Sequence, residues 1–178
     1  MKNVFVITGA PGGGKTSIIS ELESRGFRCL QEESRMLIKE LLDSGSRALP
    51  WIDMLAFNRL LLERQVRQYL CAPDGEACFF DRSFVDNLGY LKHSYIPVPE
   101  EFSEVIGKYR FNRTVFFTEP WKEIYVTDSE RKEPFDMAER LSALMKNAYI
   151  ASGYEPVAVP RLSVPERVDF VLEKIGLE

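Results

Sequence analysis

The alternation of apolar and polar positions predicts short buried strands separated by helices. Val4–Thr8 is almost wholly apolar, which is typical of a central parallel strand covered on both faces. Similar short runs predict further strands at 27–31, 77–80, 114–117 and 156–159. Between them, apolar residues recur at helical spacing and predict helices at 15–25, 34–42, 51–70, 85–92, 100–109, 137–148 and 164–175.

Strands that alternate with helices predict an α/β fold, a three-layer α/β/α sandwich around a mostly parallel five-stranded sheet. The predicted helix at 51–70 should bury one face that includes Trp51, Leu55 and Leu62. The segment at about 118–135 is polar, aromatic and irregular, and it is expected to form a movable lid. We therefore expect one domain over residues 1–178, with this lid inserted in it.

Composition narrows the class of protein. The chain has 178 residues, of which 45% are hydrophobic and 28% charged, the balance of a globular domain. Its formal net charge is −4, so the overall field repels polyanions, and no basic run opposes that field. These features favour a small phosphorylated ligand over nucleic acid as the partner.

Cysteine usage and the N-terminal segment indicate the compartment. Cys29, Cys71 and Cys78 form no CxxC pair and fit neither a disulfide framework nor a zinc site. The N-terminal residues lack the pattern of an export signal, and no apolar run approaches the roughly 20 residues of a membrane span. We expect a cytoplasmic protein without a membrane partner.

The segment after the first strand has the strongest functional signal. Residues 9–16, GAPGGGKT, match the phosphate-loop pattern G-x-x-x-x-G-K-[ST] at every fixed position. Gly12, Gly13 and Gly14 permit a tight turn through positive φ that points backbone N–H groups at one phosphate, and the next helix adds its positive N-terminal end. The pattern predicts a bound nucleoside triphosphate, with Lys15 on its β- and γ-phosphates and the Thr16 hydroxyl on Mg²⁺.

The residues expected to contact ATP belong to this loop and the turn that follows it: Gly9, Ala10, Pro11, Gly12, Gly13, Gly14, Lys15, Thr16 and Ser17. The alternative is a glycine-rich turn without a ligand. The position of the loop between a buried strand and a helix argues against that alternative.

A second group of candidate residues lies in ACFFDRS, residues 77–83. The apolar strand delivers Asp81 and Arg82 to the carboxyl edge of the sheet, where ligands bind in open α/β folds. Asp81 is placed to hold Mg²⁺, directly or through water, or else to take a proton. Arg82 offers a planar fork suited to phosphate. The alternative is an Asp that caps a turn beside a solvated Arg.

A third group follows the second predicted strand, in CLQEESRML. A carboxylate at Glu32 or Glu33 would emerge on the same edge and could orient or deprotonate an acceptor hydroxyl. Only one of the two can face the site. An acidic first turn that suits the helix dipole is the alternative.

The predicted lid holds Arg131 and Lys132. Cations on a mobile segment can close over a triphosphate, exclude water and stabilise the transferring phosphoryl group. They can also be ordinary solvated charges beside Glu130 and Glu133. Trp121 and Tyr125 could stack on a base or anchor the lid.

These motifs resemble the P-loop kinases, and more narrowly the AAA-domain ATPase group that includes the nicotinamide riboside kinase domain of NAD-biosynthesis regulators. The likeness rests on TGAPGGGKT, on Glu32-Glu33-Ser34-Arg35, on FFDRSFVD, on IYVTDSERKE and on GYEPVAVP, and so covers nearly the whole chain. It implies acceptor-side roles for Glu32 and Arg35, central roles for Asp81 and Arg82, and a lid role for Arg131.

The resemblance also implies that Val159, Pro160 and Arg161 lie near the adenine. The chain shows no second-region arginine finger, sensor motif or small helical domain, which argues against a hexameric motor. The leading hypothesis is an ATP- and Mg²⁺-dependent phosphotransferase acting on a small hydroxylated acceptor, such as a nucleoside or nucleotide-like molecule. The alternative hypothesis is a nucleotide-gated regulatory ATPase or binding module. Neither the acceptor nor the oligomeric state follows from the residues.

Overall fold

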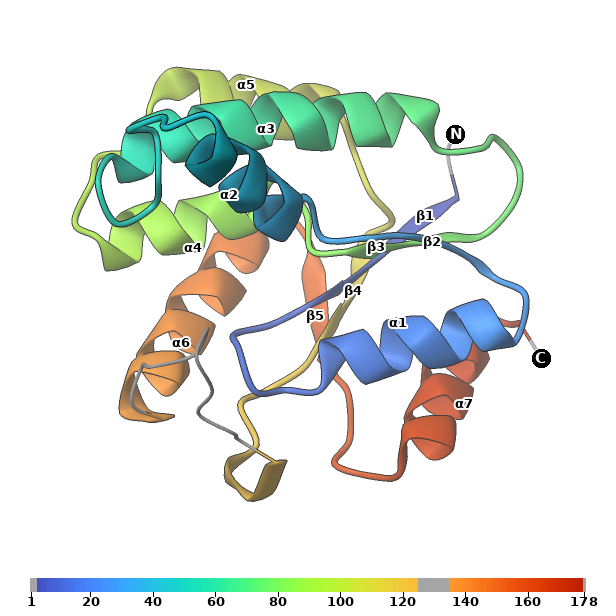
Figure 1. The fold of residues 1–178 in the computed structure, drawn as a ribbon. Helices are drawn as coiled ribbons and strands as arrows, with labels where there is room; N and C mark the ends of the chain where they lie inside the picture. Colours follow the sequence, from blue (N-terminus) through green and yellow to red (C-terminus); the bar gives the residue numbers. More distant parts are fainter. Residues whose placement is uncertain (1–2, 125–134, 178) are drawn as a thin grey trace.

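A five-stranded sheet forms the centre of the computed structural model, which describes residues 3–124 and 135–177 (Figure 1). The strands are β1 (Val4–Thr8), β2 (Arg28–Leu30), β3 (Cys78–Asp81), β4 (Thr114–Phe117) and β5 (Glu155–Ala158). They lie in the order β2-β3-β1-β4-β5, and every neighbouring pair is parallel. The predicted α/β sandwich with a five-stranded sheet is confirmed.

Helices cover both faces of the sheet. The helices are α1 (Lys15–Ser24), α2 (Glu33–Asp43), α3 (Met54–Cys71), α4 (Asp86–His93), α5 (Glu100–Lys108), α6 (Phe135–Ala151) and α7 (Val164–Lys174), with a short 3₁₀ turn, η1 (Lys122–Ile124). Figure 1 shows α1 and α7 side by side on one face, with α3, α4, α5 and α6 on the other. These are the three layers that the alternation of strands and helices predicted.

Strand β1 shows why its sequence is apolar throughout. Val4 and Val6 pack in the core shared with α3 to α6, whereas Phe5 and Ile7 pack in the core shared with α1 and α7. Because alternate side chains point to opposite faces and both faces are covered, no position of the strand is left for a polar residue until Thr8.

The helix predicted at 51–70 begins later than expected. The side chain of Asp53 accepts a hydrogen bond from the Ala56 N–H at 2.9 Å and caps α3, so Trp51 lies before the helix with 64% of its surface exposed. The prediction that Trp51 belongs to the buried face is therefore wrong.

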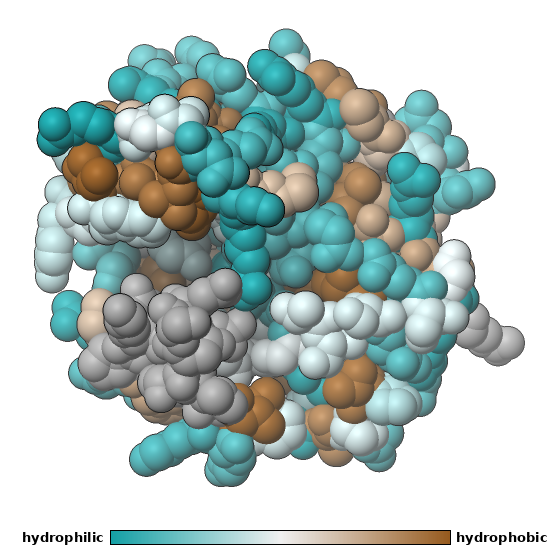
Figure 2. Space-filling view, in the orientation of Figure 1, coloured by the Kyte–Doolittle hydropathy of each residue, from teal (hydrophilic) through white to brown (hydrophobic). Residues whose placement is uncertain are grey.

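The outer surface mixes polar and apolar residues. Figure 2 shows apolar side chains gathered over α2 and the connection from α2 to α3, where the exposed apolar residues include Met36, Leu42, Trp51 and Ile52. Within residues 3–124 and 135–177, no helix combines the length and the apolar character needed to cross a membrane.

Candidate functional site

The strand order brings the two strongest sequence motifs together. β1 and β3 are neighbours, and Ile7 is in register with Asp81 at their carboxyl ends. The glycine-rich loop leaves β1 beside the point where Asp81 and Arg82 leave β3, although the two segments are far apart in the chain. This is the sheet edge at which open α/β proteins bind ligands.

The side chain of Lys15 is buried in the glycine-rich loop. Lys15 is only 7% exposed, and its ammonium group donates a hydrogen bond to the Ala10 carbonyl at 3.0 Å. No side chain caps the N-terminus of α1 at Gly14, so the amide groups of the first turn are available to an anion. Thr16 and Ser17 lie exposed in that turn. The loop therefore offers an ammonium group, free amides and hydroxyl groups at one place.

Glycine is required in the loop for two different physical reasons. Gly12 and Gly14 have φ of 85° and 73°, in the left-handed region as predicted. Gly13 does not adopt positive φ, so the prediction was wrong for this residue. A Cβ on Gly13 would lie 2.5 Å from the Thr118 hydroxyl oxygen, and one on Gly9 would lie 2.0 Å from the Thr118 carbonyl oxygen. Gly13 is needed because the chain after β4 passes against the loop, and Gly9, with φ of 137°, is needed for both reasons.

Arg82 and Glu32 form a buried pair next to the loop. Arg82 Nε donates to Glu32 Oε1 at 2.9 Å, and Arg82 Nη1 donates to the Gly9 carbonyl at 3.1 Å. The Arg82 backbone has φ of 70°, a strained conformation for a residue with a side chain. The residue is buried, with only 8% of its surface exposed. The arginine thus connects the acidic residue after β2 to the loop after β1.

The two candidate glutamates differ in direction. Glu32 faces the loop, whereas Glu33 lies 3.7 Å from Arg64 of α3. Arg35 is 57% exposed and its Nε lies 3.8 Å from Glu32 Oε2. Glu32 and Arg35 are thereby brought to the site edge, and Glu33 is turned to the helix layer.

Burial shifts the protonation of the central groups. Burial and the charge of Arg82 lower the pKa of Lys15 to about 7, against the opposing effect of Asp81. Burial raises the pKa of Asp81 above its usual range. Burial would also raise the pKa of Glu32, but Arg82, the Ser34 hydroxyl and Lys15 outweigh it and lower this pKa to about 2. Glu32 is therefore ionised at neutral pH in the unliganded site.

Asp81 suits a divalent cation. Its Oδ1 is buried and has no hydrogen-bond partner, and a cation beside it would reverse the effect of burial on its pKa. Among the residues that the structure describes, no group of three or more His, Cys, Asp or Glu side chains could hold a metal. One carboxylate, a Thr16 hydroxyl and phosphate oxygens are the donor set with which Mg²⁺ is usually bound, so the residues fit that ion.

A buried hub behind the loop was not predicted. The carboxylate of Asp86, 1% exposed, accepts hydrogen bonds from the Thr8 hydroxyl, from the Ser83 N–H at 2.7 Å and from the Tyr149 hydroxyl at 2.6 Å. Arg82 Nη1 lies 3.9 Å from Asp86 Oδ1. The hub joins the end of β1, the turn after β3 and α6, and so supports the backbone on which Arg82 is held.

The predicted lid is described only in part. Arg131, Lys132 and Tyr125 lie outside the described residues. The Trp121 N–H donates to the Gly12 carbonyl at 3.3 Å, which brings the start of this segment against the loop. Arg161 Nη2 donates to the Pro120 carbonyl at 2.9 Å, so the segments after β4 and β5 meet there.

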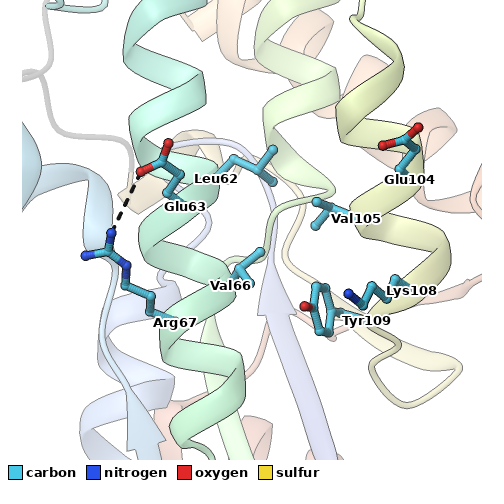
Figure 3. A pocket seen from close by; sticks show the side chains of 8 residues that line it. All are labelled: Leu62, Glu63, Val66, Arg67, Glu104, Val105, Lys108 and Tyr109. Atoms are coloured by element: carbon cyan, nitrogen blue, oxygen red, sulfur yellow. Dashed lines mark ion pairs between the residues drawn. The ribbon is translucent and has the colours of Figure 1, made fainter.

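A surface groove lies away from this edge. It is a hollow of about 470 Å³ between α3 and α5, with Leu62, Val66 and Val105 on its floor (Figure 3). Glu63 and Arg67 lie at its margin as an exposed pair 3.9 Å apart. None of the predicted site residues lines this groove, which is therefore separate from the glycine-rich loop and its neighbours.

Comparisons with known proteins agree with this geometry. A family model described as an AAA domain matches residues 4–167, and a search of curated protein sequences gave no match. Deoxyadenosine kinase from M. mycoides with the products dCMP and a flexible dCDP superimposes with a TM-score of 0.69 and 16% identity, over 97% of this chain and 98% of that chain. The same enzyme with bound dATP gives a TM-score of 0.63 and 15% identity, over 97% and 99%.

Shikimate kinase from Acinetobacter baumannii, in complex with shikimate, gives a TM-score of 0.61 and 12% identity, over 99% of this chain and 93% of that chain. At these identities the likeness shows the shared fold, that of the P-loop kinases. The family model extends from β1 into α7 and includes the glycine-rich loop. The chain therefore belongs to the AAA domain family of P-loop nucleoside triphosphatases.

Proposed function

We propose that this protein is an ATP- and Mg²⁺-dependent phosphotransferase that acts on a small hydroxylated acceptor, such as a nucleoside or nucleotide-like molecule. The observation that carries the proposal is the buried pair of Glu32 and Arg82, held against the loop through the Gly9 carbonyl. A carboxylate beside the loop can orient the hydroxyl of an acceptor, a role that a module which only binds nucleotide does not require. Neighbours in fold that are named deoxyadenosine kinase and shikimate kinase support this class of acceptor.

The loop amides and Lys15 hold the β- and γ-phosphates in this proposal. Lys15 gives up its hydrogen bond to the Ala10 carbonyl when the anion binds. The anion raises the pKa of Lys15, so the amino group is protonated and positively charged. Asp81 and Thr16 would hold Mg²⁺, which supplies positive charge to the phosphate oxygens. Arg82 is already held by Glu32 and the Gly9 carbonyl, so its charge costs little reorganisation during transfer.

Glu32 orients the acceptor hydroxyl. The acceptor oxygen forms a bond to the γ-phosphorus while the bond to the bridging oxygen breaks, and ADP leaves with that electron pair. A carboxylate with a pKa of about 2 is a weak base, so Glu32 acts by accepting a hydrogen bond rather than by removing the proton early. The hydroxyl proton is lost late, when the new phosphate ester can take it up.

Arg35 and Arg131 complete the proposed site. Arg35, beside Glu32, lies where an acceptor that is itself charged would approach. Arg131 belongs to the proposed lid at 118–135, which would close over the triphosphate and exclude water. One domain with one lid is sufficient for this chemistry.

The test is transfer of label from γ-labelled ATP to a panel of nucleosides, nucleotides, sugars and cyclic polyols, with Mg²⁺ and with EDTA. Label on an acceptor, dependent on Mg²⁺, is the expected result. Release of inorganic phosphate alone would overturn the proposal in favour of a regulatory ATPase. Lys15→Met should abolish transfer, whereas Lys92→Met, which removes an exposed lysine at the end of α4, should leave it unchanged.

A further inference from the structure

A second buried cation touches the glycine-rich loop from the opposite side. Arg167 lies at the start of α7, with 4% of its surface exposed, and its Nη2 donates to the Gly13 carbonyl at 2.7 Å. Its Nη1 lies 2.6 Å from the position that a Cβ on Gly14 would occupy. The guanidinium is therefore packed against the backbone where the loop becomes α1.

The charge of Arg167 is not compensated by the part of the chain that the structure describes. No carboxylate within residues 3–124 and 135–177 pairs with it, and its Nε is buried without a hydrogen-bond partner. Desolvation lowers its pKa, and no acidic neighbour among the described residues opposes this effect. Arg82, by contrast, is equally buried but lies beside Glu32 and Asp86.

The location increases the cost of this charge. Arg167 lies at the N-terminal end of α1, where the helix dipole is positive, and Lys15 begins the same helix. Burying an unpaired cation beside other positive charge is unfavourable, and proteins retain such groups where an anion binds. An anion in the loop would satisfy Lys15, the helix N-terminus and Arg167 together.

We propose that Arg167 is a positioning residue for the nucleotide, acting through the Gly13–Gly14 segment and through its charge on the phosphates that remain in ADP. This inference rests on the proposed function and adds to it the part of the nucleotide that the residue serves. Glu32 and Arg82 follow β2 and β3, on one side of β1, whereas Arg167 follows β5, on the other side. With the acceptor on the β2–β3 side, the phosphates that are not transferred lie toward Arg167.

The consequence is a contribution to binding that is the same before and after transfer. Arg167→Gln should weaken the binding of ADP and of ATP by the same factor, about tenfold or more, as expected for the loss of a charge-assisted contact. Turnover at saturating ATP should change by less than about threefold, because the interaction is present equally in the ground and transition states. Arg167→Lys, which keeps the charge, should recover part of the affinity.

The experiment is calorimetric titration of ADP and ATP into the full chain, together with thermal unfolding with and without ADP. If Arg167 positions nucleotide, Arg167→Met should leave the unliganded protein at least as stable as wild type and should shrink the ADP-induced rise in Tm. A residue that only packs α7 on α1 would give the opposite pattern, a less stable unliganded protein with unchanged ligand affinity. Arg113→Gln, which removes a 73% exposed arginine that precedes β4 and pairs with Glu155, is the control for the loss of one positive charge.

Unchanged ADP affinity in Arg167→Gln and Arg167→Met would overturn the inference and leave the proposed function intact. Normal ADP binding without transfer to any acceptor would overturn the proposed function and leave this inference standing. A wild-type chain that binds neither ADP nor ATP would overturn both.

Discussion

Arg82 and Glu32 are hydrogen-bonded at 2.9 Å although 50 positions separate them in the chain. The contact exists because β3 lies between β2 and β1, so the residues that follow β2 and β3 meet beside the glycine-rich loop. The strained backbone of Arg82, with φ of 70°, is tolerated because Glu32, Gly9 and Asp86 all hold its side chain. Strained residues of this kind cluster at functional sites, where the surrounding contacts hold a charged group in one place.

Glu32→Gln should reduce turnover far more than ATP affinity. The amide cannot carry the negative charge that orients the acceptor hydroxyl and balances Arg82, so we expect a loss in kcat of about 100-fold, within the usual range for a residue of this kind. ATP affinity should change by less than about threefold, because Glu32→Gln removes none of the loop groups that hold the phosphates. Steady-state kinetics with calorimetry checks both quantities, and Glu33→Gln, which alters only the pair with Arg64, is the control.

The glycines of the chain should differ sharply in their tolerance of alanine. Gly9→Ala would place a methyl group 2.0 Å from the Thr118 carbonyl oxygen, which is backbone and cannot move aside cheaply. We expect a loss of about 3 kcal/mol or more in unfolding free energy, the scale of severe overpacking. Gly107→Ala in α5 meets nothing within 4 Å and should stabilise the protein by about 0.5–1 kcal/mol. Urea denaturation measures both, and equal effects would contradict the close approach of Thr118.

The parts of the site that the sequence predicted are those that short motifs encode. Residues 9–16 follow an apolar strand in a pattern with few alternatives, and Asp81 and Arg82 end another apolar run, so their meeting at one edge could be expected. The order of the strands could not, because nothing in the apolar run at 28–30 shows that β3 will separate it from β1.

The residues that sequence reasoning missed lie on ordinary amphipathic helices. Arg167 follows a Ser-Val-Pro-Glu helix start and reads as a surface charge, and Tyr149 reads as core. Their roles depend on contacts with residues far away in the chain, Gly13 and Asp86. The reason for Gly13 was likewise hidden, since it depends on Thr118, a residue from the end of a different strand. Asp86, the second Asp in FFDRSFVD, did give a signal in the sequence. A carboxylate next to apolar residues that are expected to be buried needs hydrogen-bond partners.

Asp86→Asn should destabilise the protein and loosen Arg82. The carboxylate accepts from Thr8, Ser83 and Tyr149, whereas an amide would turn its NH₂ group toward one of these donors. We expect a loss of about 2–4 kcal/mol in unfolding free energy, the usual cost of breaking a buried charged network. Tyr149→Phe removes one donor and should cost less, about 1–2 kcal/mol. A neutral effect of Asp86→Asn in urea denaturation would contradict the hub.

Binding of ATP should take up a proton at alkaline pH. In the unliganded site, burial lowers the pKa of Lys15 to about 7, with Arg82 adding to the effect, so at pH 8.5 the group is mostly neutral. The triphosphate favours the charged ammonium and raises that pKa again. Titrations in buffers of different ionisation enthalpy should therefore show an uptake approaching one proton at pH 8.5 and little at pH 6, where Lys15 is already protonated. Lys15→Met should abolish the uptake.

The lowered pKa of Lys15 should also make the stability of the unliganded protein depend on pH. Because the pKa of Lys15 falls from 10.5 to about 7 on folding, the unfolded chain binds more protons between these values. This residue therefore destabilises the fold below pH 7, and its cost is relieved as the pH rises toward 10. The unfolding free energy of wild type minus that of Lys15→Met should increase by up to about 1.4 kcal/mol per pH unit in that window. A difference that stays flat from pH 7 to 10 would show that Lys15 keeps its ordinary pKa, with its ammonium group hydrated rather than buried in the loop.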